Sequence, residues 1–401
     1  MKNSISRKSF LKQGATLFGG ALIAPYTSLS ALSSEAQREL IRMMYNENPY
    51  GPSRIAKRAM QKAFNESNLY TMRIARNEFT DLIADQNSVD PDHITIGFGS
   101  REILNKAAMM NGIDNGQMIS PQLTFEAINQ YAKNAMNTKV QRIAMRDDLH
   151  IDLEKMASSI TKNTKMIYIC NPNNPTGLAL DSDELESFCK EVSKKIVVFI
   201  DEAYHEYAIG DGYNTMTHLI DADNKIIISR TASKVHGLAG LRVGYAISSP
   251  KMASRLKTYL NGSLNVVGLR AAIASYSDSK FQAFSIKKNN ESRKIVTDHL
   301  EKKNIKYLAS HTNFIFLKTG MEIEKFQPEM KKHGVIVGRP FPPYTRWCRL
   351  SMAKPEEMKF FIVQILDSLS DTYKKSVGDD KIAIEMKRFT QRIGKMSNVL
   401  K

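Results

Sequence analysis

The chain has 401 residues, of which 42% are hydrophobic and 24% charged, and its formal net charge is +16. This composition is typical of a soluble globular protein with a large core and two domains, and it excludes a fibrous or disordered chain. Three cysteines without a C-x-x-C spacing indicate neither a disulfide framework nor a metal site. Much of the positive charge lies at the two ends and no Lys/Arg block occurs between them, so we expect no nucleic acid as a partner.

Residues 1–34 have the pattern of an export signal. They contain four basic and no acidic residues, and the apolar stretch 14–24 is too short to span a bilayer comfortably. Residues 6–12 (S-R-K-S-F-L-K) are similar to the twin-arginine export motif, with Lys8 in place of the second arginine. We therefore expect a periplasmic protein without a stable membrane span. The alternative is an N-terminal arm, disordered or helical, on a cytoplasmic protein.

Residues 45–52 read Y-N-E-N-P-Y-G-P, and the two prolines and the glycine predict an extended, turning path. Helical spacing of apolar residues follows over 53–66. An apolar strand at 94–98 then leads through a glycine turn, with Ser100 and Arg101, into a helix. Free N–H groups and the dipole at such a helix start favour an anion, so this turn is a candidate phosphate site.

Three later apolar runs, at 165–170, 195–200 and 226–228, predict buried strands. Each is followed by a candidate polar group: Asn174, Asp201 and Lys234 respectively. Ligands of an open parallel sheet lie beyond the carboxyl ends of its strands. We therefore expect these three side chains to converge on one crevice.

Asp201 follows five apolar residues directly, and a carboxylate there is costly to desolvate unless a cation pairs with it. Its alternative role is the N-cap of the next helix. Asn174 lies in N-P-N-N-P-T-G, where two prolines and a glycine hold the backbone rigidly. Such a turn can aim an amide at a ligand.

Residues 229–245 read S-R-T-A-S-K-V-H-G-L-A-G-L-R-V-G-Y. An amine after a buried strand, such as that of Lys234, has a lowered pKa and can act as a nucleophile. Thr231, Ser233 and Arg242 are donors of the kind that a bound phosphate needs. The alternative reading is a surface loop with chance glycines.

The C-terminal part predicts a charged helix at 281–303 and strands at 313–317 and 334–339. Arg349 opens the motif R-L-S-M-A-K-P-E-E. Residues 370–401 hold eight basic and four acidic side chains, with apolar residues at helical spacing. This extension would dock on the body, bridge a dimer or contact an acidic surface.

The 229–245 stretch resembles the cofactor-binding segment of fold type I pyridoxal 5'-phosphate (PLP) aminotransferases. It is most similar to the histidinol-phosphate aminotransferase branch, which carries S-K-x-x-G-L-A-G-L-R-x-G-Y. The motifs around Asn48, Asn174 and Arg349 are similar to further motifs of this family, so the resemblance covers about residues 40–368.

The resemblance implies roles for individual residues. Lys234 would hold PLP covalently and move a proton, and Asp201 would pair with the pyridine nitrogen. Phe125 would stack on the ring, and Asn174 and Tyr204 would bind its oxygen. The cofactor phosphate would be bound by residues of the same subunit and by a tyrosine of the neighbouring one: Ser100, Arg101, Thr231, Ser233, Arg242 and Tyr70. Arg349 would clamp the substrate α-carboxylate, with Asn48 and Arg339 as further substrate candidates.

The implied fold is α/β, with a mainly parallel sheet between helices in a large PLP domain and a smaller α+β domain. The expected segments are an export signal at 1–34, an N-terminal arm at 35–60, the large domain at 61–284, the small domain at 285–368 and a basic amphipathic extension at 369–401. The active site of this family forms at a dimer interface, so we expect a homodimer.

The implied activity is PLP-dependent transfer of an amino group between an amino acid or histidinol phosphate-like donor and a 2-oxo acid. One alternative is a PLP-dependent decarboxylase of a phosphorylated amino acid, which would release CO₂. An alternative of another class is an exported, non-catalytic binding protein on a degenerate enzyme fold. The joint presence of Lys234, Asp201, Asn174 and Arg349 argues against it.

Overall fold

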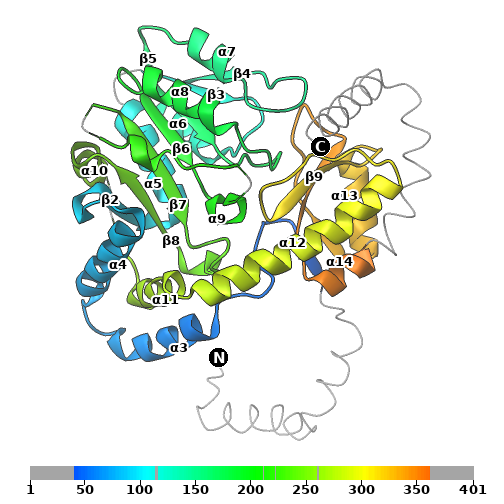
Figure 1. The fold of residues 1–401 in the computed structure, drawn as a ribbon, viewed down its shortest axis with the longest axis horizontal. Coiled ribbons are helices and arrows are strands. Elements are labelled where there is room, and N and C mark those ends of the chain that lie inside the picture. Colours follow the sequence, from blue (N-terminus) through cyan, green and yellow to red (C-terminus); the bar gives the residue numbers. More distant parts are fainter. Residues whose placement is uncertain (1–39, 113–115, 211, 222, 260–261, 362–401) are drawn as a thin grey trace, which may run out of the picture. The chain divides into compact units, whose positions relative to one another are not determined.

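Seven strands form the central sheet of the structure, a computed structural model that describes residues 40–112, 116–210, 212–221, 223–259 and 262–361 (Figure 1). The chain divides into a unit Met1–Leu40 and a unit Ile41–Lys401, and all helices and strands of the described ranges lie in the second unit. Within those ranges, no helix combines the length and the apolar character needed to cross a membrane.

The strand order of the central sheet is β2-β8-β7-β6-β5-β3-β4. Neighbouring strands from β4 to β7 are parallel, whereas β8 pairs antiparallel with both β7 and β2. The strands span β2 (Ile94–Phe98), β3 (Gln117–Pro121), β4 (Lys139–Ile143), β5 (Thr164–Cys170), β6 (Val197–Asp201), β7 (Ile226–Thr231) and β8 (Val243–Ser248). The predicted α/β class with a mainly parallel sheet is confirmed.

Side chains of the central strands alternate between two apolar clusters because successive residues of a strand point to opposite faces. On β5, Ile167 and Ile169 belong to one cluster, whereas Met166 and Tyr168 belong to the other. Helix α8 (Ser182–Val192) supplies buried residues to the first cluster, and α5 (Gly99–Gly112) supplies them to the second. Both faces of the sheet are therefore covered by helices, as parallel sheets require.

A third cluster joins the β2 edge of the sheet to three helices. These are α3 (Arg54–Ala63), α4 (Met72–Asn87) and α11 (Val266–Tyr276). The remaining helices around the sheet are α6 (Ala127–Met136), α7 (Leu153–Ser158), α9 (His205–Ala208) and α10 (Pro250–Lys257). The helix expected over 53–66 corresponds to α3, which begins at the N-cap Ser53 because its side chain accepts a bond from the Ala56 backbone N–H.

A separate group of elements combines β1 with the elements after the long helix α12 (Ser279–Lys302), which runs from beside α11 toward this group (Figure 1). Strand β1 (Ile41–Met43) pairs in parallel with β10 (Val335–Val337). Strand β9 (Phe314–Lys318) pairs antiparallel with β11 (Trp347–Ser351). Helices α13 (Ile323–Lys332) and α14 (Pro355–Phe361) pack with these strands in one apolar cluster. The sequence-based expectations for α12, β9 and β10 agree with these bounds.

Candidate functional site

The carboxyl ends of β5, β6 and β7 lie side by side at one edge of the sheet. Cys170 is paired with Asp201 across β5 and β6, and Asp201 is paired with Ser229 across β6 and β7. Asn174 and Lys234 follow β5 and β7 by a few residues. The structure therefore places all three polar groups that the sequence singled out at the same end of three adjacent strands.

Asp201 is the last residue of β6 and is 2% exposed. Its carboxylate accepts hydrogen bonds from Ser229 Oγ at 3.0 Å and from Tyr168 Oη at 3.3 Å. No described Lys, Arg or His lies within ion-pair distance of it; burial therefore raises the pKa of Asp201 to about 6. A buried carboxylate that accepts only from neutral donors, among them the Ala203 backbone N–H, and has no described ion-pair partner fits the protonated pyridine nitrogen of PLP.

Lys234 lies in the loop after β7, and its ammonium donates to the backbone carbonyls of Tyr45 and Asn46, both at 3.2 Å. Burial and then the charge of Arg349 lower the pKa of Lys234 to about 7. The loop can pack on the chain around Gly51 because Gly237 has no side chain; a Cβ at Gly237 would collide with the Gly51 carbonyl. A neutral amine near pH 7 suits covalent attachment of an aldehyde cofactor and subsequent proton transfer.

Four polar side chains form a hydrogen-bonded network next to Lys234. Asn174 Nδ2 donates to Tyr204 Oη at 3.2 Å, and Asn46 Nδ2 donates to the same hydroxyl at 2.8 Å. Arg349 Nη1 donates to Asn174 Oδ1 at 2.8 Å. The buried Nε of Arg349 has no hydrogen-bond partner in the described structure. An unpaired buried N–H costs free energy, so this guanidinium is suited to bind an anionic group of a ligand.

The turn from β2 to α5 lies against the hairpin of β7 and β8. A Cβ at Gly99 would overlap the Arg242 guanidinium, and a Cβ at Gly244 would overlap the Ser100 backbone. Thr231 Oγ1 donates to Ser233 Oγ at 2.9 Å, and Arg242 Nη1 lies 3.5 Å from that hydroxyl. These donors meet at the N-terminus of α5, where the helix dipole favours an anion.

Arg101 adds positive charge at the same place. It lines a cavity of about 360 Å³ together with Arg242 and Phe98. Burial and then the charge of Arg101 lower the pKa of Arg242. Two neighbouring guanidinium groups at a helix N-terminus fit a phosphate group, which would relieve their repulsion.

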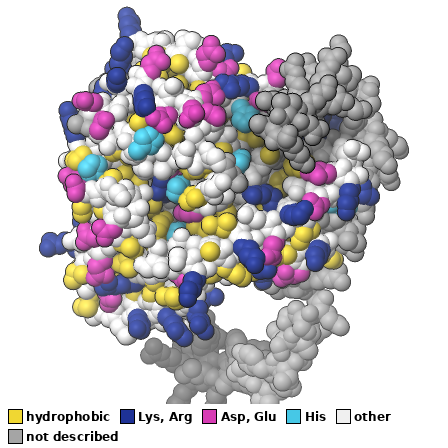
Figure 2. All heavy atoms as spheres, viewed as in Figure 1, with side chains coloured by type: hydrophobic (Ala, Val, Ile, Leu, Met, Phe, Trp, Pro, Cys, Tyr) yellow, Lys and Arg dark blue, Asp and Glu magenta, His cyan; other side chains and the backbone are white. Residues whose placement is uncertain are grey.

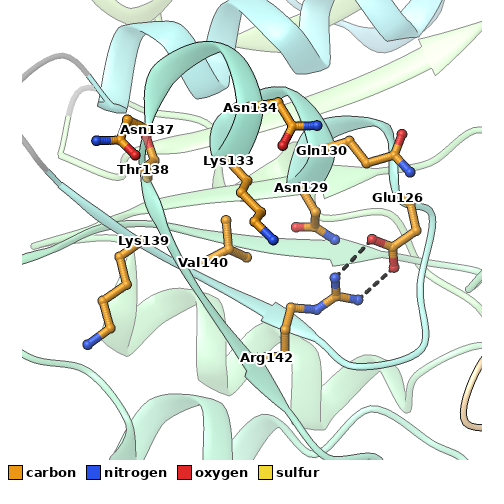
Figure 3. A pocket seen from close by; sticks show the side chains of 10 residues that line it. All are labelled: Glu126, Asn129, Gln130, Lys133, Asn134, Asn137, Thr138, Lys139, Val140 and Arg142. Atoms are coloured by element: carbon orange, nitrogen blue, oxygen red, sulfur yellow. Dashed lines mark hydrogen bonds and ion pairs between the residues drawn. The ribbon is translucent and has the colours of Figure 1, made fainter.

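Phe125 lies on the turn between β3 and α6 and packs partly buried against the cluster of α5. Arg142 of β4 holds this turn, because it donates to Pro121 O at 3.1 Å and to Gln122 O at 2.7 Å and pairs with Glu126 at 2.6 Å. Figure 3 shows the Arg142–Glu126 pair in a cavity of about 660 Å³ between α6 and β4. The turn that carries Phe125 is therefore anchored from the edge of the sheet.

Three residues that the sequence singled out lie outside this network. Asn48 donates to Val235 O at 2.8 Å and to Ser285 Oγ at 3.1 Å, so its amide joins the N-terminal segment to α12. Tyr70 is 93% exposed. Arg339 lies 4.3 Å from the centre of the Phe341 ring and donates to Pro340 O. Their roles as site residues stay predictions.

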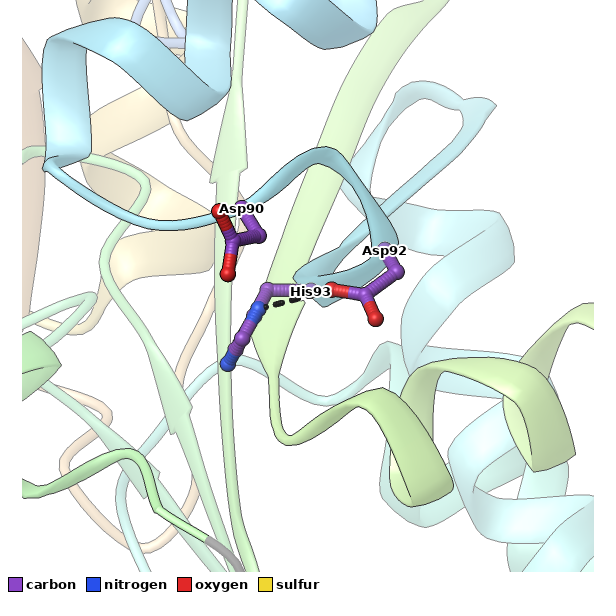
Figure 4. Close-up of side chains that lie close together, drawn as sticks. All are labelled: Asp90, Asp92 and His93. Atoms are coloured by element: carbon purple, nitrogen blue, oxygen red, sulfur yellow. Dashed lines mark hydrogen bonds and ion pairs between the residues drawn. The ribbon is translucent and has the colours of Figure 1, made fainter.

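A separate group of side chains that could bind a metal ion lies at the opposite end of β2. The possible ligand atoms of Asp90, Asp92 and His93 lie within 4.8 Å of one another, and both aspartates are exposed (Figure 4). His93 Nδ1 lies 3.0 Å from Asp92 Oδ1. His93 precedes β2 whereas Ser100 follows it, so this group is separated from the site by the length of the strand.

Four residues that contact the site were not predicted from the sequence: Asn46, Tyr168, Ser229 and Ser351. Tyr168 and Ser229 could have been found, since both occupy positions of β5 and β7 that share a face with Asp201. Ser351 lies two residues after Arg349 on β11 and thus on the same face. Asn46 lies in the same N-E-N-P motif as Asn48, and no local signal distinguishes the two asparagines.

Comparison with known proteins agrees with this geometry. The model of the aminotransferase class I and II family matches residues 38–365. A model of the gliding motility-associated protein GldC-like family matches residues 349–399, most of which lie outside the described ranges.

Two relatives are the histidinol-phosphate aminotransferase of Brevibacillus brevis and histidinol-phosphate aminotransferase 1 of Idiomarina loihiensis. Both are 33% identical to this chain; the matches cover 75% and 82% of this chain and 82% and 91% of the relatives. The crystal structure of the Sinorhizobium meliloti histidinol-phosphate aminotransferase, in complex with pyridoxal-5'-phosphate, matches with a TM-score of 0.76 at 23% identity. That match covers 93% of this chain and 99% of the other. The chain belongs to the aminotransferase class I and II family and is a PLP-dependent aminotransferase.

Proposed function

We propose that the protein moves an amino group between an amino acid or a histidinol phosphate-like donor and a 2-oxo acid. The observation that carries this proposal is the position of Lys234. Its amine, with a pKa lowered to about 7, lies at the carboxyl edge of the sheet that also holds Asp201, and it is close enough to Arg349 for the guanidinium charge to affect it. A proton-transfer group, a carboxylate for the cofactor nitrogen and a cation for the substrate are thus present together.

The cofactor, when bound, withdraws electrons from the substrate carbon that loses a proton. Lys234 would hold the cofactor and then move the proton, and Asp201 would keep the pyridine nitrogen protonated. Phe125 would support the ring face, and Asn174 and Tyr204 would bind the ring oxygen. The donors at the start of α5 would bind the cofactor phosphate; these are Ser100, Arg101, Thr231, Ser233 and Arg242.

Arg349 would bind the α-carboxylate of amino and 2-oxo acids through its planar guanidinium. Asn48 and Arg339 are further candidates on the substrate side. Two curated relatives act as histidinol-phosphate aminotransferases, which supports a donor of that kind. Histidinol phosphate lacks an α-carboxylate, so the two kinds of substrate would use Arg349 differently.

A donor screen tests the substrate proposal. The purified, PLP-loaded protein is incubated with 2-oxoglutarate and one donor at a time, chosen from histidinol phosphate and the aromatic, acidic and aliphatic amino acids. Glutamate formation identifies the donor. Release of CO₂ from a phosphorylated amino acid without glutamate formation would instead support the decarboxylase alternative and overturn this proposal.

We also propose a homodimer. Five large apolar side chains are exposed on and around α3 and α4, and Figure 2 shows hydrophobic side chains at the surface in this region. These are Ile55, Phe64, Leu69, Tyr70 and Ile74. Exposed apolar groups gathered in one region mark an interaction surface. A second copy that covers this surface would bring Tyr70 toward the cofactor phosphate of its neighbour.

Two proposals concern the organisation of the chain. The large domain would span 61–284 and the small domain 285–368, with α12 connecting them, and the arm would comprise 35–60. Residues 1–34 would be a twin-arginine-like signal that directs the protein to the periplasm. The signal and the whole 369–401 extension lie outside the described residues, and a cytoplasmic location is the alternative.

A further inference from the structure

Asn46 has a backbone conformation that few side chains adopt. Its φ angle is 56°, in the left-handed region, and the residue is 1% exposed. Asparagine tolerates this region better than other residues with a side chain, apart from aspartate. A buried, left-handed asparagine is held by its surroundings, so the contacts that it makes are informative.

The side chain of Asn46 joins two parts of the site. Its Nδ2 donates to Tyr204 Oη at 2.8 Å, and its Oδ1 accepts from Ser351 Oγ at 2.9 Å. The Asn46 backbone N–H donates to the same Ser351 hydroxyl at 2.8 Å. Ser351 shares a strand face with Arg349, so Asn46 links the strand of the substrate arginine to the tyrosine on the cofactor side.

The backbone carbonyl of Asn46 faces a third part of the site. It accepts from Lys234 Nζ at 3.2 Å and from Asn313 Nδ2 at 2.9 Å. The left-handed conformation therefore directs the amide side chain to Tyr204 and the carbonyl to Lys234 at the same time. The charged and titratable groups around it are Lys234, Tyr204, Arg349, the adjacent Glu47 and, farther away, Asp201, Cys170 and Arg242.

We propose that Asn46 is a positioning residue of the aminotransferase site: its amide strengthens the Tyr204 hydroxyl as a donor, and its carbonyl holds the Lys234 amine when that amine is free. This inference rests on the proposed roles of Tyr204 and Lys234. A hydroxyl that accepts a hydrogen bond becomes a stronger donor. Tyr204 then stabilises the anionic form of the cofactor ring oxygen more strongly, and the cofactor loses its proton at lower pH.

Three substitutions separate the two contributions. Asn46→Gly retains the left-handed backbone and the carbonyl but removes the amide. Asn46→Ala removes the amide and also disfavours the left-handed backbone. Asn46→Asp keeps the shape, but its carboxylate would accept a hydrogen bond from the Tyr204 hydroxyl instead of donating one. Asn304→Gly is the matched control, because Asn304 is also left-handed (φ 53°) and lies after α12, away from the site.

The first measurement is the pH titration of the visible absorption of the PLP-loaded full-length protein. The titration midpoint should rise by about half a pH unit in Asn46→Gly and by more in Asn46→Asp, and it should not change in Asn304→Gly.

The second measurement is steady-state kinetics. Asn46→Ala should lower kcat about fivefold relative to Asn46→Gly, since only the alanine variant displaces the carbonyl that holds Lys234.

An unchanged midpoint in both Asn46→Gly and Asn46→Asp would overturn the proposal, even if activity fell, because lost packing alone does not move this titration. If Asn46→Ala does not fold, the glycine and aspartate variants still decide the role of the amide. Failure of the proposed function looks different, since the unmodified protein would then bind PLP without transferring an amino group.

Discussion

Arg349 on β11 donates a 2.8 Å hydrogen bond from Nη1 to Oδ1 of Asn174, which lies 175 positions earlier in the chain. The bond orients the guanidinium against the rigid N-P-N-N-P-T-G turn. It also leaves the buried Nε without a partner among the described residues. Arg349 is therefore held in place by the residue proposed to bind the cofactor while part of its donor set stays available for a substrate.

Replacement of Arg349 by lysine should weaken carboxylate binding. Lysine keeps the charge but loses the planar fork, so KM for amino and 2-oxo acids should rise about tenfold, equivalent to about 1.4 kcal/mol. KM for histidinol phosphate, which lacks the α-carboxylate, should change differently. Steady-state kinetics with both donors measure this, with Arg339→Lys as the comparison. Equal losses for both donors would show that Arg349 is structural.

Replacement of Asp201 by asparagine should reduce turnover far more than cofactor content. Asparagine retains the shape and one of the two oxygens that accept from Ser229 and Tyr168, but it cannot keep the ring nitrogen protonated. We expect kcat to fall by about two orders of magnitude or more, because the cofactor then withdraws electrons poorly. The phosphate donors and Lys234 remain, so bound PLP, measured by absorption, should change little. A near-normal kcat would reduce Asp201 to a structural residue.

The same carboxylate should make the cofactor-free protein sensitive to pH. Burial raises the pKa of Asp201 from 3.8 to about 6, so the folded state keeps this proton where the unfolded state has lost it. The resulting stabilisation is complete below pH 3.8 and is lost as the pH rises through 6. Relative to Asp201→Asn, the wild-type apoprotein should lose about 2 kcal/mol of unfolding free energy between pH 4 and pH 8.

Denaturant unfolding of both proteins at the two pH values measures this difference. The asparagine variant is the reference for the wild type because it has no carboxyl group at position 201 to titrate. Addition of PLP should remove the difference at pH 8, since the pyridine nitrogen then pairs with the carboxylate. A constant difference between the two proteins at all pH values would contradict the explanation.

Lys234 should be the attachment point of the cofactor. The PLP-loaded protein should be yellow. Borohydride treatment should remove the visible band and attach the reduced cofactor permanently, as a label, to the peptide that contains Lys234. Lys234→Ala should abolish turnover and leave the fold intact, as judged by circular dichroism. Lys225→Ala, just before β7 and thus at the opposite end of the strand that leads to Lys234, is the control and should be labelled normally. Label on another lysine would refute the site assignment.

Export should depend on the basic pair in residues 1–34. Lys8→Arg restores the twin-arginine pattern and should maintain or increase the amount of periplasmic protein, whereas Arg7→Ala combined with Lys8→Ala should prevent export. Immunoblots of periplasmic and cytoplasmic fractions measure the distribution, and Lys2→Ala, outside the motif, is the control. An unchanged distribution in the double variant would exclude this route.

The sequence by itself determined the parts of the site that depend on local pattern. Apolar runs predicted β5, β6 and β7, and the polar residue after each run indicated where a ligand would lie, because parallel strands end at one edge. The rigid turn around Asn174 and the glycine-rich loop after Lys234 could also be predicted from the sequence. Proline restricts the backbone and glycine frees it, and both effects are local.

Only the tertiary structure decided how these groups are held. The donors to Asp201 come from strands on either side of β6, so their identity depends on the strand order. Asn46 reaches Tyr204 across 158 positions and Ser351 across 305, and nothing in its own motif distinguishes it from Asn48. Hydrogen bonds over such separations require that distant elements pack first, because their geometry is set by the fold and not by the neighbouring residues.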